Sequence, residues 1–184
     1  MADNTNTNTT NIPGFLTARE LFNGNVGGAH KVTSKMTGYK KIKCDCDYRS
    51  FNDYLTGTKP NGVKKTFEAV ATVEIEVGST VIRPIIIRPI TDSFLFLPPN
   101  IFVSRSLRTN EALIKRIETI TYIDRFDAEH CDCYSMRDTS FKYHLGATVK
   151  PTLPFDTDIK DINKDCTSGI HMFLNKQSAI DYVN

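Results

Sequence analysis

Residues 69–77 carry the pattern that most restricts how this chain can fold. Apolar residues take every second position in this run, at Ala69, Ala71, Val73, Ile75 and Val77. A period of two is that of a β-strand with one buried face. Further strand-like runs cover residues 101–103, 119–126, 142–149 and 170–174. The sequence therefore predicts an α+β fold, with a mainly antiparallel sheet or a partly closed barrel and a few short helices.

Three short helices are expected, over residues 17–22, 110–117 and 176–183. The first begins with the spacing of a capping box. The second has one apolar face, formed by Leu113, Ile114 and Ile117. Asn175 is expected to cap the third.

The first twelve residues form a polar tract in which eight are Asn or Thr. Such a segment cannot bury enough apolar surface to offset the entropy of ordering it, so residues 1–12 are expected to be a flexible tail. This tail is either a solvated terminus or an arm that a partner orders. Residues 13–36 are expected to hold a short helix and a Gly-rich linker, and residues 37–184 a single α+β domain.

The charge of the chain is nearly balanced, with 23 Lys or Arg, 21 Asp or Glu and a net charge of +2. This balance does not indicate a dedicated DNA-binding protein. Basic residues nevertheless gather in one region, at Lys40, Lys41, Lys43, Lys64 and Lys65. They form either one basic face, which leaves a nucleic-acid partner open, or a solvated edge protected by lysine. No apolar run approaches the ~20 residues of a membrane span, so none is expected.

The tripeptide Cys-Asp-Cys occurs twice, at residues 44–46 and 131–133. Residues i and i+2 of a strand point to one face, so each tripeptide presents two sulfur atoms together. Three interpretations stay open, namely a tetrahedral zinc site, a disulfide between the segments and ordinary half-buried thiols. The zinc ligands would be Cys44, Cys46, Cys131 and Cys133, with His130 as a replacement for one of them. We expect the two segments to lie close together. Because no signal peptide precedes them, we also expect reduced thiols, no metal and no cofactor.

Two histidines and an aspartate form the candidate catalytic site. His144 and His171 fall on the two C-terminal strand runs, and Asp165 lies in an Asp-rich loop between them. As an active site, this would be a histidine pair oriented by a carboxylate. The alternative is a surface loop and a core histidine with satisfied hydrogen bonds. The usual hydrolase, zinc-protease, kinase and nucleotide-binding motifs are missing, and the chain is expected not to be an enzyme.

The C-terminal region carries a distinctive set of residues. They are Tyr143, Gly146, Pro151, Cys166, Gly169, Ile170, His171 and Phe173. In this order they resemble a functionally uncharacterised domain of giant, nucleocytoplasmic large DNA viruses, which also occurs in some bacteria and phages. That domain ends in a Gly-Ile-His-Phe-Phe strand and a closing helix, and here Met172 replaces the first of the two phenylalanines.

The resemblance implies a viral origin and a location in the infected host-cell cytoplasm or the virion. It implies no activity, since the family has none assigned. The expected function is therefore a non-enzymatic structural or protein-interaction module of a large DNA virus, such as a minor virion or capsid-associated component. Its partners would be other viral proteins, reached through residues 1–30. The alternatives are a soluble binding factor of the viral factory and an enzyme that uses His144 and His171.

Overall fold

The computed structural model describes residues 15–16, 28–47, 64–83, 85–88, 100–103, 106–121, 128–155, 157 and 168–182. This described part consists mainly of β-strands, with one short α-helix, α3 (Lys176–Ile180), and one 3-10 turn, η1 (Ala128–His130). The expected tail over residues 1–12 and the expected helix over residues 17–22 lie outside the described residues.

The strands form one large sheet and one small one. Along the chain they are β1 (Phe15–Leu16), β2 (Gly28–Val32), β3 (Met36–Asp47), β4 (Lys64–Ile75), β5 (Thr80–Arg83), β6 (Ile85–Arg88), β7 (Asn100–Val103), β8 (Ser106–Thr109), β9 (Ala112–Thr119), β10 (Cys131–Ser135), β11 (Lys142–Tyr143), β12 (Thr148–Val149) and β13 (Ile170–Phe173). Eleven of them form a sheet in the order β1-β2-β5-β8-β13-β3-β4-β9-β12, to which β10 and β11 are joined through β3. Strands β6 and β7 pair with each other separately.

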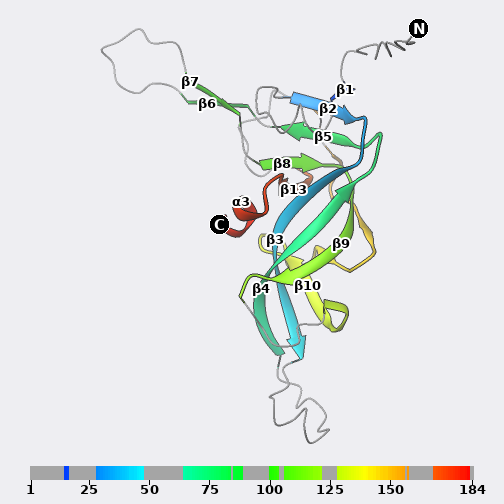
Figure 1. The fold of residues 1–184 in the computed structure, drawn as a ribbon, viewed down its shortest axis with the longest axis vertical. Coiled ribbons are helices and arrows are strands. Elements are labelled where there is room, and N and C mark those ends of the chain that lie inside the picture. Colours follow the sequence, from blue (N-terminus) through cyan, green and yellow to red (C-terminus); the bar gives the residue numbers. More distant parts are fainter. Residues whose placement is uncertain are drawn as a thin grey trace, which may run out of the picture.

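Strand β3 organises the molecule because it pairs with three other strands. On one flank, β4 follows it for its whole length. On the other flank, β13 pairs at Tyr39, and β10 pairs from Ile42 to Cys46. Two segments far apart in sequence therefore share one flank of β3, with β13 beside its first half and β10 beside its second (Figure 1).

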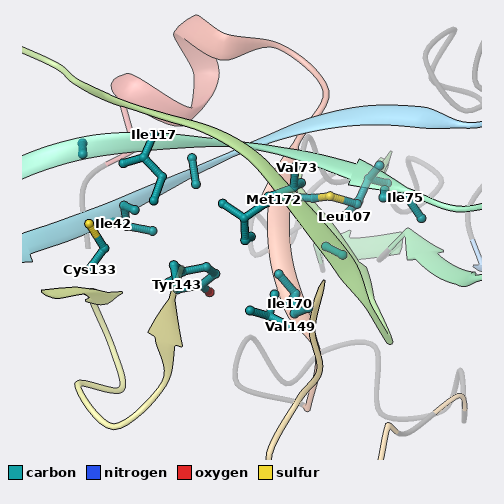
Figure 2. Packing of buried hydrophobic residues seen from close by; sticks show 14 of the residues in the cluster. Ile42, Val73, Ile75, Leu107, Ile117, Cys133, Tyr143, Val149, Ile170 and Met172 are labelled. Atoms are coloured by element: carbon teal, nitrogen blue, oxygen red, sulfur yellow. The ribbon is translucent and has the colours of Figure 1, made fainter. Parts of the chain in front are cut away.

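The hydrophobic core lies where the inner faces of β3, β4, β8, β9 and β13 meet. Its fully buried side chains include Ile42, Val73, Leu107, Ile114 and Met172, and Figure 2 shows core side chains gathered between these strands. Met172 packs over Gly38 of β3, where a Cβ would come within 2.5 Å of the Met172 sulfur. A side chain at residue 38 would therefore displace Met172 from the core.

The fold is mainly β, which corrects the expected α+β class. Among the described residues α3 is the single α-helix, and the sheet is open, so the expectation of a partly closed barrel is wrong as well. The expectation of a mainly antiparallel sheet is confirmed, since β1 and β2 form the one parallel pair of the described strands.

Residues 112–119 form β9, so the expected helix over residues 110–117 is wrong. The physical reason is a β-bulge. Ile114 lies opposite Val73 and Ile117 lies opposite Ala71, so β9 uses three residue steps where β4 uses two. The bulge gives Ile114 and Ile117 the spacing of a helix face, although both side chains are buried by the sheet.

Several other expected elements are confirmed, with changed boundaries. The run at residues 69–77 forms the second half of β4 as far as Ile75, whereas Val77 lies in the following turn and is 59% exposed. The run at residues 170–174 forms β13. Helix α3 begins as expected, and Asn175 Oδ1 accepts a hydrogen bond from the Ser178 backbone N–H at 3.1 Å. The run at residues 142–149 is not continuous, because a turn at Gly146 with a φ of +76° separates β11 from β12.

Candidate functional site

Two disulfides connect β3 to β10. Cys44 is bonded to Cys133 and Cys46 to Cys131, with sulfur–sulfur distances of 2.03 and 2.08 Å and Cα–Cα distances of 4.0 and 4.3 Å. The members of each pair lie directly opposite each other in the antiparallel register, at the close spacing where side chains meet. The expected closeness of the two Cys-Asp-Cys segments is confirmed. The expectation of reduced thiols is wrong, because this register places each sulfur atom against one on the next strand.

The Cys44–Cys133 disulfide lies in a row of apolar side chains that crosses four strands. Phe67 of β4 is opposite Cys44, and Tyr143 of β11 is opposite Cys133. Both cysteines are fully buried, and burial also raises the pKa of the Tyr143 hydroxyl. Figure 2 shows the side chain of Cys133 next to that of Ile42, with Tyr143 nearby. We call Phe67, Cys44, Cys133 and Tyr143 the inner row.

The Cys46–Cys131 disulfide lies in a shorter row at the end of the sheet. The exposed Lys65 of β4 is opposite Cys46. Pairing between β10 and β11 covers Cys133 and Tyr134 only, so none of the described strands flanks Cys131 on the side away from Cys46. Cys46 is 8% exposed, and Cys131 is half-buried. We call Lys65, Cys46 and Cys131 the outer row.

The aspartates of the two tripeptides lie on the opposite face of the sheet from the sulfur atoms. Asp45 accepts hydrogen bonds from the Thr66 hydroxyl at 2.6 Å and from the Tyr134 hydroxyl at 3.2 Å. Asp132 pairs with Lys64 Nζ at 3.0 Å, and this hydrogen bond lowers the pKa of Asp132. Each Cys-Asp-Cys segment thus has a cross-linked face and a hydrogen-bonded or ion-paired face.

The disulfides bear directly on the candidate zinc site. While the sulfur atoms are bonded in pairs, they are not thiolates and cannot ligate zinc. Among the residues that the structure describes, no group of three or more His, Cys, Asp or Glu is placed to hold a metal ion. His130, the expected replacement ligand, is an exposed residue at the end of η1, directly before Cys131. The expectation of no metal stays a prediction, and zinc binding by the reduced protein stays the alternative to it.

A second cluster of ionisable side chains lies toward the other end of β3. His171 on β13 is opposite Arg108 on β8. Arg108 is fully buried, and its Nη1 donates a hydrogen bond to the Ser168 carbonyl at 2.9 Å. Burial, with the charges of Lys40, Arg108 and Arg137, lowers the pKa of His171 to about 4. The imidazole is therefore neutral at pH 7. We call Lys40, Arg108, Arg137 and His171 the basic junction.

Packing around an aromatic pair holds the basic junction in place. Burial, with the charge of Arg137, lowers the pKa of Lys40 to about 8. Arg137 Nη2 donates a hydrogen bond to the Tyr182 hydroxyl at 2.5 Å, and the guanidinium lies 5.9 Å from the ring centroid. The Tyr182 ring lies 5.4 Å from that of Phe173 on β13. These contacts connect the segment after β10 to β13, on the flank of β3 that the two strands share.

The two histidines of the candidate catalytic site lie in different surroundings. His144 is exposed after β11, and its charge contributes to the lowered pKa of Asp132. His171 belongs to the basic junction. No hydrogen bond or ion pair between described residues joins the two imidazoles, and Asp165 lies outside the described residues. The enzyme alternative that uses His144, His171 and Asp165 therefore stays untested.

The five lysines that were expected to share one face are divided between both faces of the sheet. Strand alternation places Lys41 and Lys43 on one face of β3 and Lys40 on the other. Lys41 Nζ pairs with Glu68 at 3.1 Å, and Lys64 pairs with Asp132. The hypothesis of a single basic face is therefore wrong for these lysines, and a nucleic-acid partner stays untested.

Several of the described residues that carry the family resemblance take part in packing. Tyr143 belongs to the inner row, Ile170 is buried in the core, and Phe173 packs on Tyr182. Pro151 is half-buried after β12, and Cys166 lies outside the described residues.

The two family-type glycines serve different purposes. Gly169 has a φ of +137°, and a Cβ there would come within 2.9 Å of the Phe155 ring and 3.2 Å of Arg108 Cβ. Gly146 has a φ of +76° and nothing within 4 Å of its Cβ position. Gly169 is therefore required for both conformation and space, whereas Gly146 is required for conformation alone.

Sequence reasoning missed Arg108 and Arg137. Alternation with the buried Leu107 places Arg108 on the other face of β8, where an arginine is expected to meet solvent. Arg108 is buried because Phe155 and Ser168, from a segment far along the chain, cover that face. No local pattern signals such a cover.

Comparisons with known proteins agree with the resemblance to an uncharacterised giant-virus domain. Uncharacterized protein L223 of Acanthamoeba polyphaga mimivirus is 28% identical over 158 residues, which cover 86% of this chain and 90% of that protein. No solved structure matches. None of the helices in the described part of the chain has the length and apolar character to cross a membrane. The profile of a family of unknown function, DUF5758, matches residues 29–179, a range that includes both disulfides and the basic junction. The chain therefore belongs to the DUF5758 family.

Proposed function

We propose that the chain is a non-enzymatic structural or protein-interaction module of a large DNA virus, carried in the virion as a minor component. The observation that carries the proposal is the pair of disulfides between β3 and β10. Disulfides persist in oxidising surroundings, of which a virion surface is one, and they are rare in the cytosol. A cross-linked sheet suits a protein that has to remain folded in a particle outside the cell.

Two further observations support this proposal. The relative described above is a mimivirus protein. Strands β1 and β2, which lie within residues 15–32, form one edge of the large sheet. Edge strands are where a second chain can add to a sheet. We therefore propose residues 1–30 as the region that contacts other viral proteins.

The test is a protein inventory of purified virions by mass spectrometry, with thiols blocked at the moment of particle lysis. We expect the chain in the particles, with Cys44, Cys46, Cys131 and Cys133 protected from the blocking reagent. Viral replication proteins, followed in the same samples, control for contamination from infected cells. Presence of the chain in infected cells and its absence from particles would overturn the virion role and favour a soluble factor of the viral factory.

A further inference from the structure

The two disulfides share one chemistry but differ in what lies beyond each sulfur atom. In thiol–disulfide exchange, a thiolate attacks one sulfur along the line of the sulfur–sulfur bond, so access along that line governs the rate. The register places the buried Tyr143 of β11 directly opposite Cys133, and Cys133 is fully buried. Cys131 is half-buried. An incoming thiolate therefore reaches Cys131 more readily than Cys133, which is covered on the side of Tyr143.

The leaving groups differ in the same direction. Attack on Cys131 releases Cys46 as a thiolate, and Lys65 stands directly opposite Cys46 in the register. A neighbouring ammonium group lowers the pKa of a thiol, and a thiol of lower pKa leaves faster. Attack on Cys133 would release Cys44 opposite Phe67, in fully apolar surroundings where a thiolate is disfavoured.

We propose that Cys46–Cys131 is an exchange site for a small thiol of the glutathione class, which forms a mixed disulfide with Cys131. The thiolate attacks Cys131 Sγ, the Cys46–Cys131 bond breaks, and Cys46 takes the electron pair. A second thiolate then attacks the sulfur of the bound thiol and releases Cys131. In total, two external thiols become one disulfide, and the protein disulfide becomes two thiols. Strands β3 and β10 stay joined through Cys44–Cys133 throughout this reduction.

The test exposes the native, oxidised full chain to reduced glutathione, blocks thiols with iodoacetamide at intervals and maps the products by mass spectrometry. We expect Cys46 and Cys131 to react at least about tenfold faster than Cys44 and Cys133, with the glutathione adduct on Cys131. Each Cys-Asp-Cys segment lies within one tryptic peptide (residues 44–49 and 126–137), so fragmentation assigns the individual cysteine. Cys166 lies in a separate tryptic peptide and does not interfere.

Matched variants isolate the cause of the difference. Lys65→Gln is expected to slow the reaction of the outer disulfide about threefold, because it removes the cationic side chain of the residue that the register places opposite Cys46. Lys64→Gln is the control, since Lys64 lies next to Lys65 in the sequence but on the opposite face of the sheet, where it pairs with Asp132. A Cys44→Ser, Cys133→Ser double variant keeps the outer disulfide alone and should react at the wild-type rate. Equal rates for the two wild-type disulfides, or reaction only after denaturant is added, would overturn the proposal.

Discussion

The two halves of β3 are held against their neighbours by different kinds of contact, covalent in the second half and noncovalent in the first. The second half is joined to β10 by two covalent bonds, and its inner face is apolar. The first half lies beside the basic junction, where burial and then the charges of Lys40, Arg108 and Arg137 lower the pKa of His171. The second half therefore gathers groups that stabilise their own contact, whereas the first half gathers basic groups that are partly removed from water and held by hydrogen bonds and ring contacts.

The two halves of β3 therefore contribute differently to the stability of the sheet. Like charges that are partly removed from water weaken a fold unless other contacts hold them in place. The cross-linked half supplies such contacts, because it fixes the register of β3 against β10 whatever the state of the junction. We expect perturbations of the two halves to differ accordingly, in size and in their dependence on pH.

The largest effect is expected when both covalent links are removed. Each disulfide closes a long loop, with sequence separations of 89 and 85 residues. In the chain-entropy account a loop of this length is worth about 4.5 kcal/mol. The loops are nested, however, so once one disulfide has formed, the other closes a loop of only a few residues. Replacing all four cysteines by alanine should therefore cost at least about 4.5 kcal/mol of unfolding free energy, measured by urea denaturation.

The matched double variants sharpen this prediction. Cys46→Ala with Cys131→Ala should cost about 2 kcal/mol or less, because the inner disulfide still closes the long loop. Cys44→Ala with Cys133→Ala should cost somewhat more, since it also leaves a cavity in the core. If each double variant accounted for half of the total loss, the nested-loop argument would be contradicted.

A smaller effect is expected at the start of β13. Gly169→Ala should destabilise the protein by about 3 kcal/mol, because the new Cβ meets Phe155 and φ is positive. Gly78→Ala is the control, since its φ is +88° but nothing lies within 4 Å of its Cβ position. That variant should lose only about 1 kcal/mol, the cost of the backbone conformation. Equal midpoints of thermal unfolding for the two variants would show that the space beside Phe155 is not tight.

The smallest effect is expected from titration of the basic junction. His171 has a pKa of about 4 in the folded protein, against an ordinary value of 6.5. As the pH falls, the unfolded chain binds this proton first, so the contribution of His171 to stability is intact above about pH 6.5 and is lost as the pH falls toward 4. The wild type should lose about 2 kcal/mol more than His171→Gln between pH 7 and pH 4. Parallel curves of unfolding free energy against pH for the two proteins would contradict the assigned burial.

The sequence could predict the features that depend on neighbouring residues. The alternation in β4 and the cap at Asn175 are local, and the structure confirms both. The two Cys-Asp-Cys segments were also expected to meet, since each places two sulfur atoms on one strand face. The oxidised state was missed because it depends on the cross-strand register, which a single strand does not specify.

The rest of the fold depends on long-range contacts. The bulge opposite Thr72 and Val73 gives the buried apolar residues of β9 the spacing of a helix face. This spacing can be assigned to a strand only once the register with β4 is known. The basic junction was invisible for a similar reason. Lys40, Arg108, Arg137 and His171 come from four separate segments, and no motif connects them.

The cross-links also give the molecule an unusual connectivity. Because Cys44 is bonded to Cys133, the backbone from residue 44 to residue 133 is a closed covalent ring that contains β4 to β9. Two arms leave this ring, one ending at residue 1 and the other at residue 184. The arms meet again outside it, where Tyr39 pairs with Phe173. A single backbone cut inside the ring, at any residue between 47 and 130, would leave the protein as one covalent molecule until its disulfides were reduced, whereas a cut in either arm would leave a piece held by noncovalent contacts alone.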